Sequence, residues 1–546
     1  MGPPTRVGGG PTFRYSDANA KPCRSPALSR QLLKSTAVVG GMTLVSRILG
    51  FVRDVVFARM FGAAAGMDAF LVAFKIPNFL RRMFAEGAFS QGFVPVLSEV
   101  KTRQGHDDVR VLVDHVAGTL GLVLFGLTAV AVVAAPLLIM VFAPGFIGDD
   151  GRFDLAAGML RITFPYLLFI SLTACAGGIL NAYGRFAVPA FTPVLLNLAL
   201  LGAAWWLAPR MDEPITALAW GVFIAGIAQL AFQLPFLARL GLLPRPRPAF
   251  RDPGVRRIMK LMGPALFGAS VTQLNLLIDT LIASFLVAGS VSWLYYSDRL
   301  VEFPLGVFGI ALATVILPSL SQRHAETDPE AFSRTLDWAL RWVLLLGTPC
   351  AVGLMVLAGP ILATLFQYGA FAAHDVDMAA RSLVAYSVGL LGFILVKVLA
   401  PGYFARQDTK TPVKIGIVAM ATNVVMNLIL VWSLAHAGLA LATSIAAFVN
   451  AGLLYMGLRR AGVCTHLPGW GVLFARVTLA NGLLAALLWW GAGDLADWLA
   501  RDALARAGHL LLWVAAGAGL YFGVLFASGL RPADLLSAPS MPRDDA

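Results

Sequence analysis

The sequence predicts an all-α protein that crosses a membrane many times, and three observations support this fold class. Of the 546 residues, 58% are hydrophobic and only 13% are charged, whereas about a quarter of the residues in an ordinary soluble domain carry a charge. Apolar runs of about 20 residues, long enough for a helix to cross a bilayer, recur along the chain. Lys and Arg gather in the connections between these runs. A conventional soluble enzyme is excluded, because its surface would need more charge.

The formal charge of +12 does not indicate a nucleic-acid-binding protein, since that function requires a basic patch on a solvated domain and the sequence contains no such domain. The four cysteines stand far apart without paired spacing, which indicates neither a disulfide framework nor a zinc site. The sequence also lacks a GxxxxGK[ST] loop for nucleotide and an HExxH motif. We therefore expect no catalytic site, no metal and no bound cofactor.

The elements follow one another from the N-terminus. Residues 1–28 are rich in Gly, Pro, Ser and Arg and have no apolar centre, so they are expected to form a disordered tail and not a cleavable signal peptide. About fourteen membrane helices are then predicted. Their approximate limits are 33–61, 66–97, 109–142, 153–182, 187–208, 215–238, 254–287, 290–320, 332–366, 375–404, 411–434, 438–458, 470–492 and 506–530.

The connections alternate between basic and nearly neutral, as the positive-inside rule predicts. If the N-terminus is inside, the inside set includes the tail, the 239–257 loop and the pair Arg459 and Arg460. The outside set then holds only about four arginines. Because an even number of spans returns the chain to its starting side, both termini are expected in the cytoplasm.

An internal repeat predicts two lobes. The segment from Ala65, with Lys75 ten residues on, can be laid against the segment from Gly289, with Arg299 ten residues on. The offset of about 220–230 residues is that of a six-helix unit repeated in parallel. The expected organisation is a tail 1–28, an N-lobe 29–240, a cytoplasmic linker 241–253, a C-lobe 254–460, two C-terminal helices 461–530 and a cytoplasmic tail 531–546.

Charged residues inside the predicted spans gather in few places, and each costs at least about 2.5–3.5 kcal/mol at mid-membrane, so by default they mark functional sites. Those of the first lobe, with one amide among them, are Arg47, Arg53, Asp54, Asp68, Lys75, Asn78, Arg82 and Glu86. Asp68, Lys75 and Arg82 are spaced by seven, which places them on one helix face.

In the second lobe, Asp298, Arg299 and Glu302 project from one face of the eighth span. Arg299 corresponds in the repeat to the lysine of the second span. Asp279 in the seventh span is expected either to serve a cation or to orient an arginine. Lys397 lies near a span end and either snorkels or contributes to the site.

Ion pairs within a helix, such as Arg82 with Glu86, would explain single charges structurally. They do not explain the whole set, because its basic residues outnumber its acidic ones. The surplus positive charge calls for an anion. Arginine suits a pyrophosphate through its planar donor fork and permanent charge.

Several long strings resemble the MviN/MurJ family of lipid II flippases. They are SRILGFVRD from Ser46, FKIPN from Phe74, RRMFAEGAFSQ from Arg81, GSVSWLYYSDR from Gly289, FQYG from Phe366, KVLAPG from Lys397 and RQDTKTP from Arg406. The resemblance covers about residues 30–530. The positions that match the family's functional residues are Arg47, Arg53, Asp68, Arg82 and Arg299.

This resemblance implies the fold of the MOP exporter superfamily, with two six-helix lobes around a central cavity and two C-terminal helices that form a groove for a polyprenyl chain. It implies a bacterial inner-membrane protein that moves lipid II, the undecaprenyl-pyrophosphate-linked precursor of peptidoglycan, from the cytoplasmic to the periplasmic leaflet. The implied partners are lipid II and the bilayer, with other cell-wall synthesis proteins as further candidates.

We therefore expect alternating access around a cavity lined by the first, second, seventh and eighth helices. The expected substrate-binding residues are Arg47, Arg53, Asp68, Lys75, Arg82 and Arg299. Supporting or ion-coupling roles are expected for Asp54, Asn78, Glu86, Asp279, Asp298, Glu302 and Lys397. A coupling ion or the membrane potential would supply the energy.

Three alternatives remain open. A flippase for another polyprenyl-pyrophosphate-linked oligosaccharide would bind the same anionic group. A cation-coupled drug exporter would need an acidic excess in its cavity. A membrane scaffold for other cell-wall proteins would need no charges in a cavity at all.

Overall fold

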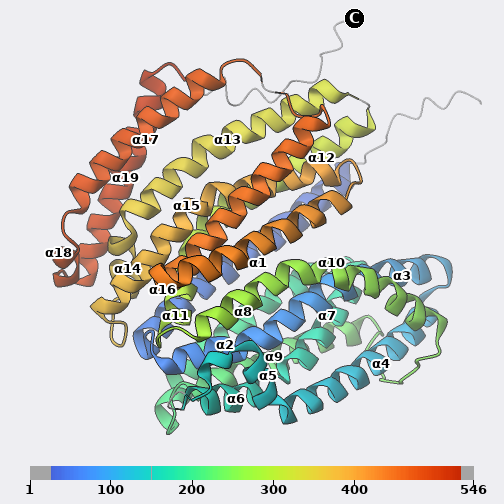
Figure 1. The fold of residues 1–546 in the computed structure, drawn as a ribbon. Helices are drawn as coiled ribbons and strands as arrows, with labels where there is room; N and C mark the ends of the chain where they lie inside the picture. Colours follow the sequence, from blue (N-terminus) through green and yellow to red (C-terminus); the bar gives the residue numbers. More distant parts are fainter. Residues whose placement is uncertain (1–25, 149–150, 327, 466, 531–546) are drawn as a thin grey trace, which may run out of the picture.

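The computed structural model describes residues 26–148, 151–326, 328–465 and 467–530. Every regular element in these residues is a helix, as the composition predicts. The helices form two lobes that meet toward the left of Figure 1 and separate toward the right. The first helix, α1 (Pro26–Phe61), runs between the two groups of helices in Figure 1.

The first lobe contains six helical paths, several of them built from two or three elements. They are α1 (Pro26–Phe61); α2 (Ala65–Arg81) with the π-helix η1 (Arg82–Phe89) and α3 (Ser90–Arg103); α4 (His106–Val133) with α5 (Ala135–Phe142) and the short η2 (Pro144–Phe146); α6 (Arg152–Thr163) with α7 (Tyr166–Ala182); α8 (Ala187–Gly202) with η3 (Ala203–Leu207) and η4 (Ala208–Arg210); and α9 (Thr216–Arg239).

The second lobe and the C-terminal helices follow the same plan. They are α10 (Pro253–Ser284); α11 (Ser290–Pro304) with the π-helix η5 (Leu305–Gly309) and α12 (Ile310–Ala325); α13 (Pro329–Val356) with α14 (Ala358–Phe366); α15 (Ala373–Phe404); α16 (Lys410–Arg460); α17 (Trp470–Ala492); α18 (Leu495–Ala500); and α19 (Ala503–Ala527).

The predicted spans fall on these helices in order. The spans predicted for 411–434 and 438–458 are the two arms of α16, which bends at Ala435, where φ is 49° and ψ is −128°. Within the described residues, ten helices are long and apolar enough to cross a membrane. These ten do not include α1, α2 with α3, or α10, which carry many of the charges inside the predicted spans. The count of about fourteen spans therefore stays a prediction.

The two lobes repeat an unusual feature. A π-helix follows α2 as η1 and follows α11 as η5, and in each case an α-helix continues the path. Because π-helical turns are rare and occur often at functional sites, their recurrence at corresponding places supports the internal repeat.

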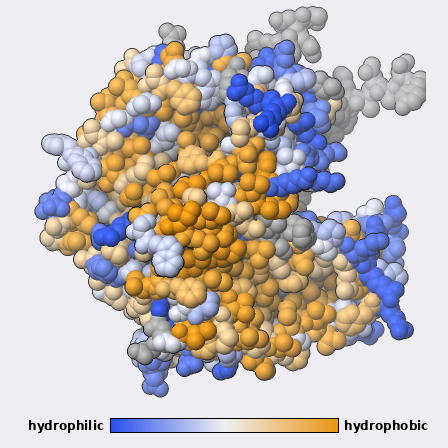
Figure 2. Space-filling view, viewed as in Figure 1, coloured by the Kyte–Doolittle hydropathy of each residue, from blue (hydrophilic) through white to orange (hydrophobic). Residues whose placement is uncertain are grey.

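The surface of the bundle suits a lipid environment. In Figure 2 a broad hydrophobic area covers the centre of the visible face, and hydrophilic residues gather toward its left and right ends. Large apolar side chains such as Trp205, Trp432 and Trp489 are 78–89% exposed. In a membrane this apolar area would face lipid, because a soluble monomer rarely exposes so large a patch.

The lobes meet at the end of α1 through backbone contacts. The N–H of Ala370 donates to Arg59 O at 2.9 Å. Gly62 and Gly369 both have positive φ values, of 63° and 61°. A Cβ on Gly62 would lie 2.9 Å from the carbonyl carbon of Ala370 and still closer to its oxygen, and a Cβ on Gly369 would collide with Arg59 O. We call this group, Arg59, Gly62, Gly369 and Ala370, the glycine contact.

The connection between the lobes is fixed along α4. Asp114 accepts the N–H of Arg245 at 2.7 Å through its side chain and the N–H of Arg247 at 3.1 Å through its carbonyl. Thr119 Oγ1 accepts the N–H of Ala249 at 2.9 Å. The segment predicted to be the linker, 241–253, therefore lies on the first lobe along much of its length.

The C-terminal helices are fastened to the second lobe at both ends. Near the start of α17, Trp470 Nε1 donates to the buried carboxylate of Asp337 on α13 at 2.6 Å. Near the start of α19, the buried Arg506 donates to Ala363 O of α14 at 3.0 Å. In Figure 1 these helices lie on the side of the second lobe that faces away from the first lobe.

Candidate functional site

A cavity of about 240 Å³ lies between the two lobes. Residues of α2, η1, α10 and α11 form most of its wall, and Tyr386 of α15 and Thr443 of α16 complete it. The second, seventh and eighth helices thus line the cavity as predicted. The first helix adds no residue to the described lining, and the sequence reasoning missed α15 and α16.

The charges in the described part of this lining are balanced. Three basic and three acidic residues face the cavity, namely Lys75, Arg82, Arg299, Asp279, Asp298 and Glu302. The basic excess of the sequence is therefore not a property of the lining itself. It arises only when the neighbouring residues of α1 are counted.

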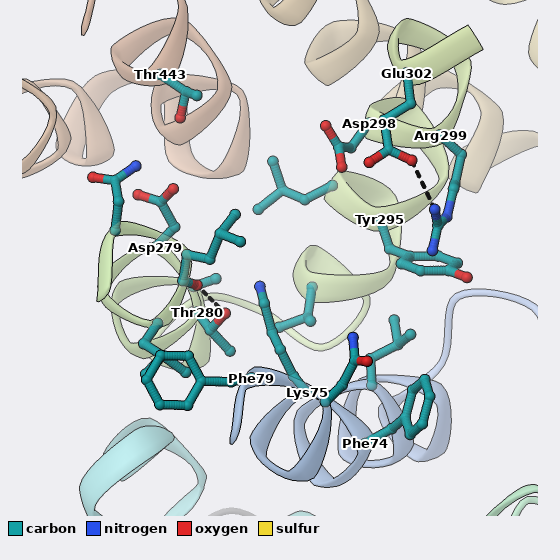
Figure 3. A pocket seen from close by; sticks show the side chains of 18 of the residues that line it. Phe74, Lys75, Phe79, Asp279, Thr280, Tyr295, Asp298, Arg299, Glu302 and Thr443 are labelled. Atoms are coloured by element: carbon teal, nitrogen blue, oxygen red, sulfur yellow. Dashed lines mark hydrogen bonds and ion pairs between the residues drawn. The ribbon is translucent and has the colours of Figure 1, made fainter. Parts of the chain in front are cut away.

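Lys75 occupies the centre of the cavity. Its side chain extends from α2 into the space between Asp279 on α10 and Asp298 on α11 (Figure 3). Asn78, one turn further along α2, lines the same wall and accepts a hydrogen bond from Arg81 Nε at 2.9 Å. The ammonium thus lies where an anion or either acid can reach it.

Arg53 lies beside the cavity in a saturated network. Its Nε and Nη2 donate to Asp54 Oδ1 at 3.0 and 2.7 Å. Its Nη1 donates to Asn197 at 3.0 Å, and its Nη2 also donates to the hydroxyl of Tyr295 at 3.1 Å. Tyr295 in turn donates to Asp54 at 2.8 Å. Because only 8% of Arg53 is exposed, it cannot touch a ligand in the cavity without rearrangement.

Arg299 approaches the same carboxylate from the other lobe. Its Nε lies 3.4 Å from Asp54 Oδ2, and its Nη1 pairs with Glu302 at 2.7 Å. Its guanidinium lies over the ring of Tyr295, 4.9 Å from the centroid. With 36% of its side chain exposed, Arg299 remains open to the cavity (Figure 3). The structure therefore brings Arg53 and Arg299 together on Asp54.

Asp68 serves a different place from the one predicted. It is fully buried and accepts hydrogen bonds from Gly289 N at 2.7 Å, Ser292 N at 2.8 Å and Ser292 Oγ at 2.6 Å. These donors form the first turn of α11, so Asp68 of the first lobe caps a helix of the second. It is absent from the described cavity lining, and its geometry is that of a contact between lobes and not of a substrate ligand.

Two of the remaining predicted residues, Arg47 and Lys397, are absent from the described cavity lining. Arg47 is exposed on α1, with its guanidinium against Gly306 of η5. Lys397 is exposed on α15, where its Cγ lies near Gly309. The side chain of Glu86 falls outside the described part of the structure.

A group of oxygen-bearing side chains surrounds Asp279. Asn427 Nδ2 donates to Asp279 Oδ1 at 2.7 Å. When its amide nitrogen faces them, Asn423 reaches Asp279 Oδ1 and Asn275 Oδ1, each at 3.0 Å. Thr443 lies on the same side of the cavity (Figure 3). Two of these residues, Asn423 and Asn427, were missed by the sequence reasoning as members of the site.

The internal repeat held the signal for two missed partners. Asn197 and Asn427 stand 230 residues apart, which is within the offset of the repeat. Asn197 accepts a hydrogen bond from Arg53, and Asn427 donates one to Asp279, so each amide contacts a charged residue of its own lobe. Amide side chains inside apolar helices at corresponding positions therefore mark residues that orient a charge.

Comparison with known proteins gives a family match over most of the chain. The family described as lipid II flippase MurJ matches residues 57–506. A probable lipid II flippase MurJ of Vibrio cholerae serotype O1 is 49% identical over 519 residues, which cover 94% of this chain and 99% of that protein. The lipid II flippase MurJ of Burkholderia cenocepacia is 45% identical over 506 residues, covering 92% of this chain and 98% of the relative.

Two solved structures extend the comparison. The lipid II flippase MurJ in an inward closed conformation matches with a TM-score of 0.72 and 26% identity, over 90% of this chain and all of the other. An inward-facing multidrug resistance transporter of the MATE family, in the MOP superfamily, matches with a TM-score of 0.63 and 14% identity over 78% of this chain and 98% of its own. At that identity the second likeness concerns the fold alone.

Proposed function

The chain belongs to the MurJ family of lipid II flippases, and from this membership we propose that it moves lipid II from the cytoplasmic to the periplasmic leaflet of the bacterial inner membrane by alternating access. One observation carries the proposal to particular residues. Two guanidinium groups, one from each lobe, meet at Asp54 beside a cavity that contains a further lysine and arginine. A diphosphate is the anion that such a set suits.

The first step of the proposed mechanism is capture of the diphosphate by the accessible cations. Arg299, Lys75 and Arg82 line the cavity, and Arg299 keeps part of its donor fork exposed. Before the substrate arrives, Asp54 and Glu302 hold this fork in place. A diphosphate, with more negative charge and more acceptor oxygens than either carboxylate, competes with them for it.

The second step recruits Arg53. A diphosphate that displaces Asp54 from Arg299 also disturbs the Asp54 contact to Arg53, because both arginines share that carboxylate. In this way substrate binding would move the acid that bridges these two arginines, and so shift the balance between conformations of the lobes. Asp68, Asp54 and Tyr295 act here as residues that position lobes and cations.

The proposed orientation rests on the distribution of basic residues and on the shape of the bundle. The described chain begins in α1 and ends in α19 at the end of the bundle opposite α18 (Figure 1). The connections at that end are the basic ones, which favours a cytoplasmic location for both termini. The glycine contact and Asp68 then lie on the periplasmic side, so the arrangement is closed toward the periplasm.

For the energy source we propose coupling through Asp279. A hard monovalent or divalent cation prefers carboxylate and amide oxygens as ligands. Asn423 and Asn427 now turn their amide nitrogens toward Asp279, and we propose that a cation bound to Asp279 would turn their oxygens toward itself. Lys75 points toward the same carboxylate (Figure 3). A cation at Asp279 would release Lys75 toward the diphosphate. The membrane potential, worth about 2.3 kcal/mol per charge per 100 mV, would act on the same charges. Flipping in vesicles with imposed gradients tests this: indifference to both sodium and potential would contradict it.

The decisive experiment on function uses purified protein in vesicles with fluorescent lipid II. We expect translocation by the wild type, loss of at least about tenfold in Arg299→Ala, and partial retention in Arg299→Lys, which keeps the charge without the fork. Arg381→Ala is the matched control, because Arg381 pairs with Asp377 on an exposed face of α15. Normal translocation by folded Arg299→Ala would contradict the site assignment.

The same vesicles separate the alternatives. A different polyprenyl-diphosphate oligosaccharide that is flipped in preference to lipid II would identify that lipid as the substrate. Failure of the folded wild type to move any such lipid would favour a scaffold. Because we propose transport without covalent chemistry, the recovered lipid II is expected to be chemically unchanged.

A further inference from the structure

Gly306 in the π-helix η5 contacts a side chain of the opposite lobe. An ideal Cβ built on Gly306 would lie 3.1 Å from Cζ and 3.2 Å from Nη2 of Arg47, and would overlap Nη1. Arg47 belongs to α1, so its guanidinium crosses from the first lobe to lie directly on the backbone of the second. Only glycine leaves the room that this guanidinium occupies.

The local sequence and geometry of η5 are unfavourable for helix stability. Glycine inside a helix is less favourable than alanine, and a π-helical stretch is less regular than the α-helix it interrupts. Both features coincide at the point where Arg47 approaches, immediately after Pro304. Their coincidence at a charged residue of the other lobe indicates a function for the gap and not a packing accident.

We propose that Gly306 is a positioning residue for Arg47. The missing side chain on η5 forms a seat that holds the exposed guanidinium of Arg47 between the lobes, one helical turn beyond Glu302 of the cavity wall, where it would meet a diphosphate on its way into the cavity. This inference rests on the proposed function, since it concerns how an arginine of that site is held. The seat exists only while α1 and η5 are adjacent, so Arg47 is fixed in this arrangement of the lobes and released when they part.

The chain supplies a matched control on the same π-helix. A Cβ on Gly309 would meet Leu305 Cδ1 at 3.0 Å, with Ile394 and Lys397 no closer than 3.8 Å, and it would not approach Arg47. Gly309→Ala therefore tests the effect of alanine in η5 without touching the seat. In Gly306→Ala the colliding atoms are the far end of a flexible side chain, so the variant should fold and displace only the guanidinium.

A double-mutant cycle tests the proposal, with lipid II binding and flipping measured for Gly306→Ala, Arg47→Ala and the pair. We expect Gly306→Ala to weaken both by about 5–10-fold, the scale of one ordinary hydrogen bond, because the guanidinium is displaced and not removed. We expect the pair to be no worse than Arg47→Ala alone, because Gly306 acts only through Arg47. Gly309→Ala should stay within about twofold of the wild type.

Wild-type behaviour of Gly306→Ala, or a loss in the pair equal to the product of the single losses, would overturn the inference. A second measurement separates its failure from that of the proposed function. In a cysteine-free background that still flips lipid II, Arg47→Cys and Gly306→Cys should cross-link through a bifunctional thiol reagent about as long as an arginine side chain. Such a reagent is needed because the contact is made by the end of that side chain, whereas a direct disulfide requires Cα atoms within about 7 Å. If they cross-link while Arg47→Ala flips normally, the contact is real and the role of Arg47 in transport is wrong. If they do not cross-link, the seat itself is wrong.

Discussion

Asp54 Oδ2 of α1 lies 3.4 Å from Nε of Arg299 of α11, and the other oxygen of this carboxylate accepts two hydrogen bonds from the neighbouring Arg53. One buried acid therefore joins guanidinium groups from both lobes. Its removal leaves Arg53 buried without a compensating charge, which is far more costly than the loss of a pair at the surface.

Asp54→Asn should accordingly destabilise the protein by about 3–5 kcal/mol, whereas Glu302→Gln should change stability by no more than about 1 kcal/mol. The difference arises because Glu302, 48% exposed, pairs with Arg299 in reach of water, while only 3% of the Asp54 side chain is exposed. Thermal unfolding in detergent measures both variants. Equal effects would show that the Asp54 network contributes no more than a surface pair.

Asp68→Asn should open the periplasmic side of the lobe contact. An amide retains one acceptor oxygen for the three donors that Asp68 now satisfies, and it lacks the negative charge that favours a helix N-terminus. A cysteine introduced at the buried Ala63 should then react faster with a membrane-impermeant maleimide added outside. Unchanged labelling in a folded variant would mean that the cap does not hold this end closed.

Gly62→Ala should weaken the glycine contact beyond the ordinary cost of its backbone conformation. An alanine with φ near +63° is strained by about 1 kcal/mol, and its Cβ would in addition collide with Ala370. Gly148→Ala is the control, because Gly148 has a φ of 83° with nothing within 4 Å of an added Cβ. We expect Gly62→Ala to lose more thermal stability and to label faster at the periplasmic side. Identical behaviour of the two variants would show that the effect of Gly62→Ala comes from backbone strain alone and not from the contact with Ala370.

The stability contributed by the start of α16 should depend on pH. Hydrogen bonds from the Thr411 side chain and N–H hold the pKa of Asp408 below its ordinary value of 3.8. A carboxyl group whose pKa is depressed on folding stabilises the fold above its unfolded pKa, and this contribution is lost as the pH falls through the folded value. The wild type should therefore lose a small stability advantage over Asp408→Asn only below about pH 4. Parallel unfolding curves from pH 7 down to pH 3 would contradict this.

The sequence predicts much of this architecture for physical reasons. Membrane helices can be recognised from the length and hydropathy of apolar runs, and the predicted spans accordingly fall on the observed helices in order. The place of Asp68 could not be predicted from spacing, because a residue in the first turn of α2 shares a helix face with Lys75 yet lies beside the N-terminus of α11. Only the tertiary structure brings that partner near.

The shared use of Asp54 was also beyond the sequence. Charge counting treated Arg53 as an open ligand, but its donors are already engaged by Asp54, Asn197 and Tyr295. Tyr295 lies in a string that the sequence analysis singled out, yet its hydroxyl carries no signal of what it contacts. Balance in the cavity lining likewise emerges only from the arrangement of helices, because counting along the chain cannot tell which charges face the same space.

The fastening of the C-terminal helices through Asp337 and Arg506 has a consequence for how movement is shared. Because α17 is tied to α13 and α19 to α14, we expect the two C-terminal helices to move together with the second lobe as one rigid body. A polyprenyl chain bound to these helices would then keep its position relative to the second lobe, while the first lobe moves relative to both. The flexible tail of the substrate would stay bound during transport, and only the head group would have to cross from one face of the membrane to the other.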